Sequence, residues 1–248
     1  MREAERPAGV VEDLDLTLFV PCYNEERQIV NTLETAVAAA REIGCTWEIV
    51  IIDDASRDRT VPLIEEYLAG HPGEPIRLIR REKNKGLAYN YVDGAFHGRG
   101  RWYRIVHGDN PEPKETMVKV LREMGSADLI LTYHELVENR SFARRSLSRL
   151  YTAIVNVATG FKLRYWNGTT LLARYDVMRW HSYATGFGFS ADTIATLLFE
   201  GRTYKEVSGV YREQPGRRSK AFRIKNVISV VYSILSLFLR RIGRTLIR

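Results

Sequence analysis

Short apolar runs alternate with amphipathic segments along the first half of this chain. The runs lie at residues 16–20, 47–52, 76–79, 102–106 and 128–132, and the segments between them repeat apolar residues at helical spacing. Strands that alternate with helices in this way form right-handed βαβ units on a mostly parallel sheet. The pattern therefore predicts an α/β fold with a Rossmann-like, mostly parallel sheet flanked by helices.

Several residues mark where helices begin and end. Asn24, Thr60 and Ser190 are expected to cap three helices, and Gly160 is expected to end another. The helix before that glycine is expected to turn three apolar side chains toward the core: Leu150, Ile154 and Val157. These boundaries continue the α/β pattern into the second half, where short strands are expected at 170–173 and 204–211.

The end of the chain, from residue 223 to 248, has a different pattern. Residues 227–239 carry no charge and would form about 20 Å of helix, which is shorter than the roughly 30 Å hydrocarbon core of a bilayer. Basic residues flank them on both sides. Such an apolar, amphipathic helix either lies in the membrane interface with its arginines on anionic headgroups, or packs on the domain or on another subunit. The two interpretations are compatible.

Charge is unevenly distributed along the chain. The 248 residues include 37 Lys and Arg and 30 Asp and Glu, which give a formal net charge of +7. Ten of the basic residues and one acid lie between 212 and 248, so the preceding 211 residues are slightly acidic. The tail therefore suits an anionic surface, while the body lacks the positive charge expected of a nucleic-acid-binding protein.

The two cysteines, Cys22 and Cys45, each adjoin an apolar run. Two cysteines make no disulfide framework, and we expect both to be buried thiols in a reducing compartment. The first residues mix basic and acidic side chains and lack the apolar core of a signal peptide. The sequence therefore predicts a cytoplasmic location.

Acidic residues follow three of the predicted strands. Glu25 follows the first, Asp53 and Asp54 end the second, and Asp109 follows the fourth within His107-Gly-Asp-Asn110. The carboxyl ends of parallel strands meet at one edge of the sheet, where ligands bind. There is no glycine-rich phosphate loop, and an acidic edge would repel a diphosphate unless a divalent cation lay between them. The chemistry implied is a metal-bridged nucleotide, although the segment 107–110 taken alone is also an ordinary turn.

Four motifs occur in an order that resembles a known family. They are Phe19-Val-Pro-Cys-Tyr-Asn-Glu-Glu26, Ile51-Ile-Asp-Asp-Ala-Ser-Arg-Asp-Arg-Thr60, Asn84-Lys-Gly-Leu-Ala88 and Gly108-Asp109. Over residues 15–222 the chain resembles the family 2 glycosyltransferases of the GT-A fold, above all the dolichol- or polyprenyl-phosphate hexosyltransferases. The resemblance implies a flexible arm (1–14), a glycosyltransferase domain with a nucleotide-binding half (15–135) and an acceptor half (136–222), and a helical tail (223–248).

The resemblance also implies an inverting transfer of a sugar from a nucleotide diphosphate donor. The residues that would hold the nucleotide sugar or lie beside it are Pro21, Tyr23, Glu25, Asp53, Asp54, Lys85 and Gly108. Asp109 would carry the divalent cation, Mn2+ or Mg2+, that binds the diphosphate. Together with the cation, Arg212 and Lys220 would stabilise the departing diphosphate.

Two departures from the family pattern concern the metal and the phosphate. The family usually has Asp-x-Asp where this chain has His107-Gly-Asp109, and an imidazole can ligate manganese but suits magnesium poorly. Asn110 offers an amide oxygen as a substitute ligand. The family often has Arg-x-x-Gly-x-Ser-Lys near the carboxyl terminus; here Ser219 and Lys220 remain, and either Arg212 or Arg218 takes the role of the first arginine.

The acceptor decides whether the reaction needs a base. A sugar hydroxyl needs one, and Asp192 is the candidate, unless that residue only stabilises the first turn of a helix. A phosphate monoester is already largely ionised at neutral pH and needs cations instead. The residues that could hold an acceptor phosphate, unless they form a solvated basic face, are Arg140, Arg144, Arg145, Arg212, Arg218, Ser219 and Lys220.

The sequence therefore predicts a hexosyltransferase that is peripherally associated with the cytoplasmic face of a membrane and uses a polyprenyl phosphate acceptor. Its expected partners are a nucleotide diphosphate sugar, the lipid phosphate and the membrane surface, with a second copy of the chain at the tail as a further candidate. Two other functions stay open. One is transfer to a saccharide or protein hydroxyl, and the other is a catalytically weak binding protein with the same fold.

Overall fold

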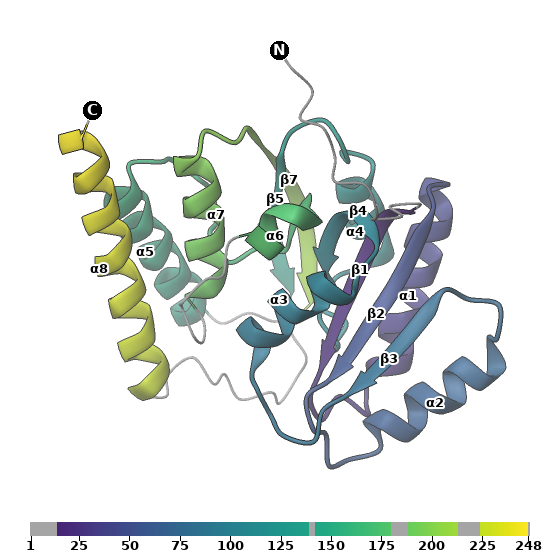
Figure 1. Ribbon diagram of the computed structural model, residues 1–248. Helices are drawn as coiled ribbons and strands as arrows, with labels where there is room; N and C mark the ends of the chain where they lie inside the picture. Colours follow the sequence, from purple (N-terminus) through teal and green to yellow (C-terminus); the bar gives the residue numbers. More distant parts are fainter. Residues whose placement is uncertain (1–13, 139–141, 180–187, 213–223, 248) are drawn as a thin grey trace.

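The computed structural model describes residues 14–138, 142–179, 188–212 and 224–247 (Figure 1). In these residues seven strands form one sheet in the order β3-β2-β1-β4-β6-β5-β7. Neighbouring strands are parallel except at β6, which runs antiparallel to both β4 and β5. The predicted mostly parallel α/β sheet is therefore confirmed. The strands are β1 (Leu14–Cys22), β2 (Trp47–Asp53), β3 (Ile76–Arg80), β4 (Gly100–Ile105), β5 (Leu129–Glu138), β6 (Thr170–Ala173) and β7 (Tyr204–Arg212).

Helices cover both faces of the sheet (Figure 1). Alternate residues of β1 serve the two faces, with Leu18 in one hydrophobic core and Phe19 in the other, as the two-residue period of a strand requires. The helices on the side of Leu18 are α1 (Ile29–Ile43), α2 (Thr60–Gly70) and α4 (Lys114–Leu121). Those on the side of Phe19 are α3 (Leu87–His97), α5 (Phe142–Thr159), α6 (Arg174–Arg179), α7 (Phe189–Phe199) and α8 (Ile224–Ile247).

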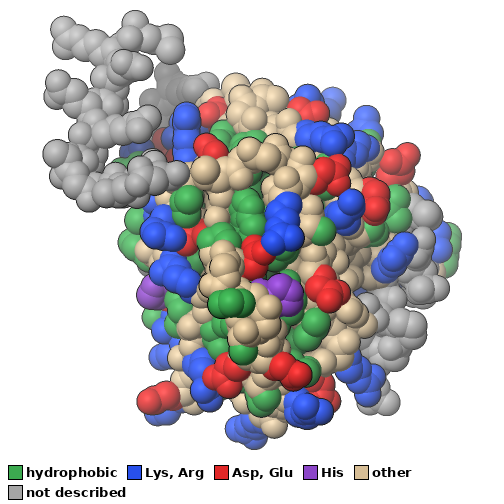
Figure 2. All heavy atoms as spheres, turned by 90° about the vertical axis from the view of Figure 1, so that its right-hand side faces the viewer, with side chains coloured by type: hydrophobic (Ala, Val, Ile, Leu, Met, Phe, Trp, Pro, Cys, Tyr) green, Lys and Arg blue, Asp and Glu red, His purple; other side chains and the backbone are tan. Residues whose placement is uncertain are grey.

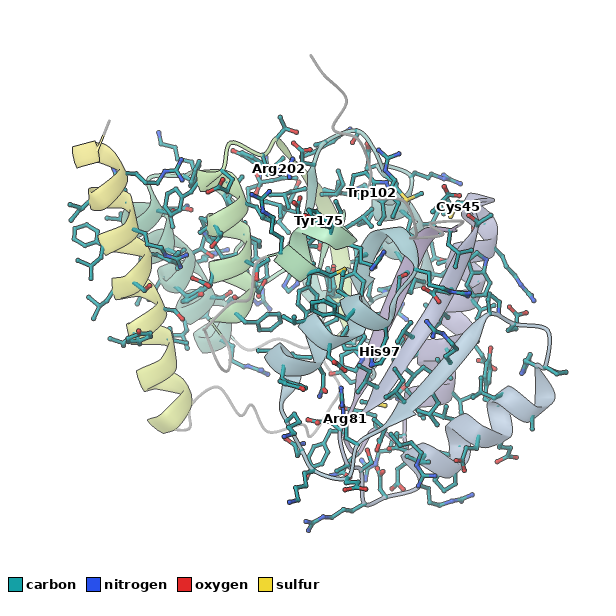
Figure 3. All side chains as sticks on the ribbon, in the orientation of Figure 1. Cys45, Arg81, His97, Trp102, Tyr175 and Arg202 are labelled. Carbon is teal, nitrogen blue, oxygen red and sulfur yellow. The ribbon has the colours of Figure 1, made fainter. Side chains whose placement is uncertain are left out.

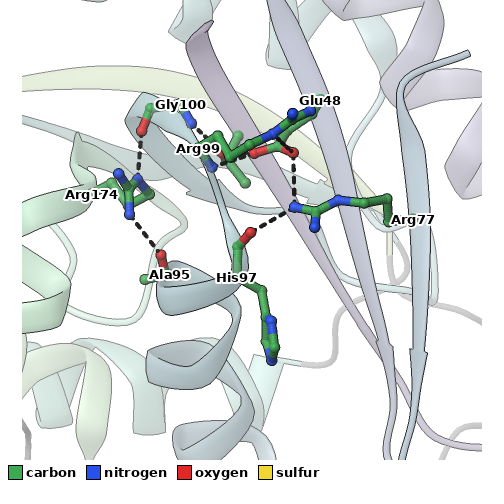
Figure 4. Close-up of polar contacts among 8 residues, drawn as sticks. Glu48, Arg77, Ala95, His97, Arg99, Gly100 and Arg174 are labelled. Carbon is green, nitrogen blue, oxygen red and sulfur yellow. Dashed lines mark hydrogen bonds and ion pairs between the residues drawn. The ribbon is translucent and has the colours of Figure 1, made fainter. Parts of the chain in front are cut away.

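A buried carboxylate ties the strands together at their amino-terminal edge (Figure 4). Glu48 accepts hydrogen bonds from the Thr17 hydroxyl at 2.9 Å, from the Arg77 guanidinium at 3.0 Å and from the backbone N–H of Arg99. Nearby, the Arg174 guanidinium donates to the carbonyl of Gly100 at 2.7 Å. Because a buried charge is costly unless it is paired and hydrogen-bonded, this network fixes β1, β2, β3 and β4 relative to one another. The opposite, carboxyl-terminal edge carries the loops that form the candidate site.

The three predicted capping residues lie at or near helix starts but have other roles. Asn24 lies five residues before α1, and its side-chain oxygen accepts the backbone N–H of Arg57 at 2.8 Å. Thr60 is already the first residue of α2, and its N–H donates to the Asp58 carboxylate at 3.0 Å. Ser190 lies inside α7, where its hydroxyl donates to the carbonyl of Trp166 at 3.3 Å. The predicted caps are therefore wrong, because contacts between loops outweigh the local preference.

The inner face predicted for α5 is also wrong. Leu150, Ile154 and Val157 are 56%, 42% and 72% exposed. The rotation of the helix is set instead by Asn156, whose side chain accepts the indole N–H of Trp166 at 2.7 Å and pairs with the backbone of Leu163. Small side chains then face the core at Thr152, Val155 and Ala158. The predicted end of the helix is confirmed: Thr159 is the last residue of α5, and Gly160 follows with a φ of 81°.

The tail forms α8, which is longer than its uncharged stretch and lies along the outer edge of the molecule (Figure 1). It packs against α5 and α7. Among the helices that the structure describes, none has both the length and the apolar character needed to cross a bilayer.

Candidate active site at the carboxyl edge of the sheet

The loops after β1 and β2 interlock at this edge. Strand pairing sets Cys22 opposite Asp53. Beyond the strands, the backbone N–H of Asn24 donates to the Ser56 hydroxyl at 2.9 Å, and that of Glu25 donates to the Thr60 hydroxyl at 2.8 Å. Asn24 has a φ of 59°, a left-handed conformation that asparagine tolerates better than most residues. Asn24, which the sequence predicted to begin a helix, therefore joins these two loops instead.

Asp53 lies at the base of this contact and is 2% exposed. One of its carboxylate oxygens accepts the backbone N–H of Ser56 at 3.0 Å, and the other lies 3.9 Å from the sulfur of Cys22. Burial raises the pKa of the Cys22 thiol well above its usual value, and the negative charges of Asp53 and Glu25 raise it further. Cys22 is therefore an inert thiol, buried as predicted. Cys45 is only partly buried, which corrects the expectation for that residue.

The second acid of the pair, Asp54, organises the loop that leads into α3. Its two carboxylate oxygens accept the backbone N–H groups of Lys85 at 2.7 Å and Gly86 at 2.9 Å. The side-chain amide of Asn84 donates to the Asp54 carbonyl at 3.0 Å. Gly86 has a φ of 86°, which suits glycine. Asp54 therefore holds Lys85 at the site edge through the backbone.

Replacing Asp54 with alanine tests this role. Loss of an ionised acceptor from two backbone donors should lower the free energy of unfolding by about 2–3 kcal/mol and weaken nucleotide binding. D54N keeps one acceptor oxygen and should lose about half as much. Urea denaturation and nucleotide titration measure the two effects, and E66A on the exposed surface of α2 serves as the control. If D54A were as stable as E66A, the role assigned to the carboxylate would be wrong.

A pocket of about 590 Å3 opens beside these loops. Tyr23 and Asp53, both predicted to contact the donor, line it. Its charged side chains are four basic and four acidic: Arg57, Arg80, Arg81, Lys83, Asp53, Asp58, Glu65 and Glu82. Figure 2 views the molecule from the side of α2 and β3 and shows the same interspersed mixture of charges over that whole face. The pocket therefore suits a polar ligand with an aromatic group that Tyr23 can contact.

Arg81 connects the pocket to α3 (Figure 3). Its guanidinium forms an ion pair with Asp93 and lies 5.5 Å from the centre of the Tyr89 ring. The ammonium of Lys85 lies 5.9 Å from the same ring. Arg81 therefore lines the pocket and reaches α3, whereas Lys85 contacts the same tyrosine from the loop before α3. His97 lies one turn after Asp93, and burial together with Arg81 and Arg77 lowers its pKa.

The loop after β4 packs directly on the loop after β1. A Cβ atom at Gly108 would lie 3.0 Å from the Pro21 carbonyl oxygen and 3.3 Å from Cγ of Glu25, so a larger residue here would require these neighbours to shift by a few tenths of an ångström. The Thr32 hydroxyl of α1 donates to the Gly108 carbonyl at 2.9 Å. This packing places Asp109 beside the predicted donor residues Pro21 and Glu25.

The neighbours of Gly108 supply the candidate metal ligands. His107, Asp109 and Asn110 are partly exposed, and Asn110 has a φ of 48°. The Asn110 N–H donates to the His107 carbonyl at 3.1 Å, which closes a tight turn. Residues 107–110 therefore form a tight turn that also carries the candidate metal ligands. Carboxylate and amide oxygens are donors that hard divalent cations take, and they occur here at the edge where a diphosphate would lie.

Arg104 and Glu112, which the sequence analysis did not single out, hold this loop in place. Glu112 is buried and accepts hydrogen bonds from the fully buried guanidinium of Arg104 at 2.7 Å and from the Tyr211 hydroxyl at 3.3 Å. One residue earlier, the Pro111 carbonyl accepts the backbone N–H of Arg212 at 2.7 Å. An arginine inside an apolar strand and a glutamate between two prolines were the available signals. The contact brings Arg212, a predicted phosphate ligand, to the metal loop.

The structure also places the remaining predicted residues that it describes. Asp192 lies in the first turn of α7, where its carboxylate forms an ion pair with Arg240 of α8. Arg144 and Arg145 lie near the start of α5. The other predicted phosphate ligands fall outside the described residues: Arg140, Arg218, Ser219 and Lys220.

Similarity to known proteins covers the part of the chain that carries the four motifs. The family model described as glycosyl transferase family 2 matches residues 17–184. A dodecaprenyl-phosphate galacturonate synthase from Rhizobium johnstonii is 27% identical over 172 residues, which cover 68% of this chain and 50% of that protein. A dolichyl-phosphate beta-glucosyltransferase from Dictyostelium discoideum is 27% identical over 153 residues, covering 55% and 47%. The chain thus spans about half the length of these curated relatives.

Solved structures share the fold. A mannosyltransferase from Pyrobaculum calidifontis in complex with GDP-Man and Mn2+ superposes with a TM-score of 0.68 at 18% identity, covering 90% of this chain and 64% of that one. At this identity the likeness shows the fold alone. The predicted GT-A fold is confirmed.

Proposed function

The chain belongs to glycosyl transferase family 2, and from that premise we propose that it moves a hexose from a nucleotide diphosphate sugar to a polyprenyl phosphate with inversion. One observation carries the proposal. The loop that bears Asp109 packs against Pro21 and Glu25, next to a pocket that Tyr23 and Asp53 line. A cation ligand and a nucleotide-sized pocket therefore share one edge of the sheet. The sugar would be activated where they meet.

The donor end of the site is built for a nucleoside. Tyr23 offers an aromatic surface for a base, and the buried Asp53 carboxylate is a hydrogen-bond acceptor for its N–H groups or for ribose hydroxyls. Lys85, held at the edge by Asp54, supplies positive charge toward the phosphates. The pocket of about 590 Å3 is within the range of small-molecule sites.

A divalent cation fits the loop after β4. Asp109 and Asn110 offer oxygen donors, and His107 a nitrogen that manganese accepts more readily than magnesium. In the described residues no three histidine, cysteine or acidic side chains form a group that could hold a metal by themselves. The diphosphate would complete the coordination, as phosphates often do for Mg2+. When bound, the cation would neutralise the charge that develops on the leaving diphosphate.

The proposed acceptor is the phosphate of a polyprenyl lipid. A phosphate monoester has a second pKa of about 6, so at neutral pH it attacks without a strong protein base. Arg212, which the Pro111 contact holds beside the metal loop, would orient it. The relatives named for dodecaprenyl-phosphate and dolichyl-phosphate products are consistent with this chemistry. We further propose that the protein works at the cytoplasmic face of a membrane, bound peripherally.

A panel of nucleotide sugars tests this proposal. Purified protein is given Mn2+, each nucleotide sugar in turn, and either polyprenyl phosphate in detergent or detergent alone. At least one donor should yield a lipid-linked sugar only when polyprenyl phosphate is present. Hydrolysis of the donor without lipid product in every case would contradict the acceptor. No reaction and no nucleotide binding would favour the alternative of a binding protein with this fold.

Replacing Asp192 separates the two kinds of acceptor. If the acceptor is a hydroxyl, D192N removes the general base and should lower kcat by about 10^2-fold or more. With a phosphate acceptor we expect less than about a fivefold change, because the carboxylate pairs with Arg240 and the nucleophile is already ionised. The pH dependence of kcat distinguishes a lost base from a structural effect. A large loss with polyprenyl phosphate, in a folded variant, would assign the base role to Asp192.

A further inference from the structure

Two neighbouring helices on the edge of the molecule expose apolar stripes. The exposed large apolar residues of α8 follow helical spacing: Val231, Tyr232, Leu235, Phe238, Leu239 and Ile242. Over this length the stripe extends about 17 Å along the helix. α5 packs beside α8 and exposes Leu147, Leu150, Ile154 and Val157 in the same manner. Large exposed apolar patches mark interaction sites in proteins.

Each of the three arginines of α8 contacts the body of the protein. Arg240 pairs with Asp192 and donates to the Thr196 hydroxyl at 2.9 Å, both on α7. Arg241 donates to the carbonyl of Val157 on α5 at 2.6 Å. These contacts fix the rotation of α8 about its axis.

The third arginine, Arg244, completes this arrangement. It lies 3.7 Å from the Glu200 carboxylate and 5.5 Å from the centre of the Phe199 ring. All three described arginines near the end of the helix therefore contact α5, α7 or the residue that follows α7. The outward stripe between residues 231 and 242 is consequently free of charge, although the sequence there includes Arg240 and Arg241.

The charges around the stripe indicate what covers it. Neither α5 nor α8 contains an acidic residue, and Arg145 and Arg149 are exposed on α5. A twofold dimer through this face would set the patch against itself and bring like charges together, without an acid on either helix to offset them. A bilayer offers an apolar interior for the stripe and phosphate groups for the arginines at its border.

From this arrangement we infer that the outward face of α8, with the adjoining stripe of α5, docks on a lipid bilayer by inserting its apolar side chains. The contacts of Arg240, Arg241 and Arg244 with the domain orient α8 so that this face points outward. These three arginines do not drive the docking by binding lipid headgroups. The inference rests on the proposed function only in taking a lipid surface as the natural partner of an enzyme with a lipid acceptor. Docking in this way would place the acceptor phosphate at the membrane surface that faces the glycosyltransferase domain.

Vesicle flotation tests the docking face without any sugar transfer. The whole 248-residue chain is floated with phosphatidylcholine vesicles that contain or lack phosphatidylglycerol. The wild type should float with both, and L235S/L239S should bind at least about tenfold more weakly because two leucine side chains no longer enter the bilayer. The matched control is Y175S on α6, which removes a side chain of similar exposure, 64% against 57% and 66%, and should float like the wild type.

Three results would overturn the inference: a wild type that does not float, a folded L235S/L239S that floats equally well, or a wild-type dimer that this variant converts to monomers in light scattering. The last would make the face a self-association surface. Circular dichroism establishes that the variant is folded. Transfer to polyprenyl phosphate in detergent tests the proposed function separately, so either idea can fail while the other stands.

Discussion

Replacing Asp109 with alanine should lower sugar transfer by about 10^3-fold or more while leaving the protein folded. Asp109 is the one acid in the loop after β4 that the packing of Gly108 places beside the donor residues. Without its carboxylate, the cation would lose its only charged protein ligand in that loop, and the leaving diphosphate would lose its main neutralising charge. The measurement is initial rate against Mn2+ concentration, since a weakened metal site shifts the concentration needed as well as the maximum.

Two controls make the result for Asp109 specific. E115A removes an exposed carboxylate at the start of α4, six residues further along, and should retain full activity. H107A distinguishes a ligand from a neighbour: if the imidazole binds the metal, its loss should reduce activity more with manganese than with magnesium. Full activity of D109A would show that the loop after β4 does not hold a cation that sugar transfer needs.

Replacing Glu112 with alanine should destabilise the protein by about 3–5 kcal/mol. The change leaves the guanidinium of Arg104, which is fully buried, without its 2.7 Å partner. A lone buried charge is far more costly than a missing surface contact, and the Tyr211 hydroxyl loses its 3.3 Å acceptor as well. Urea denaturation measures the loss. Activity should fall too, since Glu112 anchors the loop that carries Asp109.

A double variant distinguishes the loss of the Arg104–Glu112 ion pair from a loss of packing at the same position. R104M/E112L replaces both charges with apolar side chains of similar size and should recover most of the lost stability, because paired removal leaves no unpaired charge. If R104M/E112L were as unstable as E112A, packing rather than charge would explain the effect. If E112A itself lost less than about 1 kcal/mol, the ion pair would not be what fixes the loop.

The edge of the sheet could be predicted because its signals are local. An apolar run that ends abruptly in Asp53 or Asp109 specifies both the strand and the residue it delivers, and parallel pairing then brings such ends together. The α/β fold class and the edge that carries the candidate site followed from these signals. The exact partners did not. Asp54 bonds residues 31 and 32 positions away, and no periodicity reports a contact of that separation.

Helix rotation was the part that sequence patterns could not supply. α5 and α8 both carry apolar residues around much of their circumference, so several faces could have been buried. In α5 the choice is made by Asn156 and its contacts with Trp166, and in α8 by arginines that find acceptors on α5 and α7. Arginines beside an apolar stretch were compatible with contacts to headgroups or to the domain, and Arg240 and Arg241 do contact the domain. Local sequence cannot show which distant partner is available.

The central claim is that the nucleophile is a lipid phosphate, and a matched pair of acceptors tests it most directly. Polyprenyl phosphate and the corresponding polyprenol, which differ only in the phosphate, are compared with the donor that the panel identifies. The account predicts sugar transfer to polyprenyl phosphate and none to polyprenol, with D192N close to the wild type. Equal transfer to the alcohol, or transfer only to a saccharide or protein hydroxyl, would contradict it.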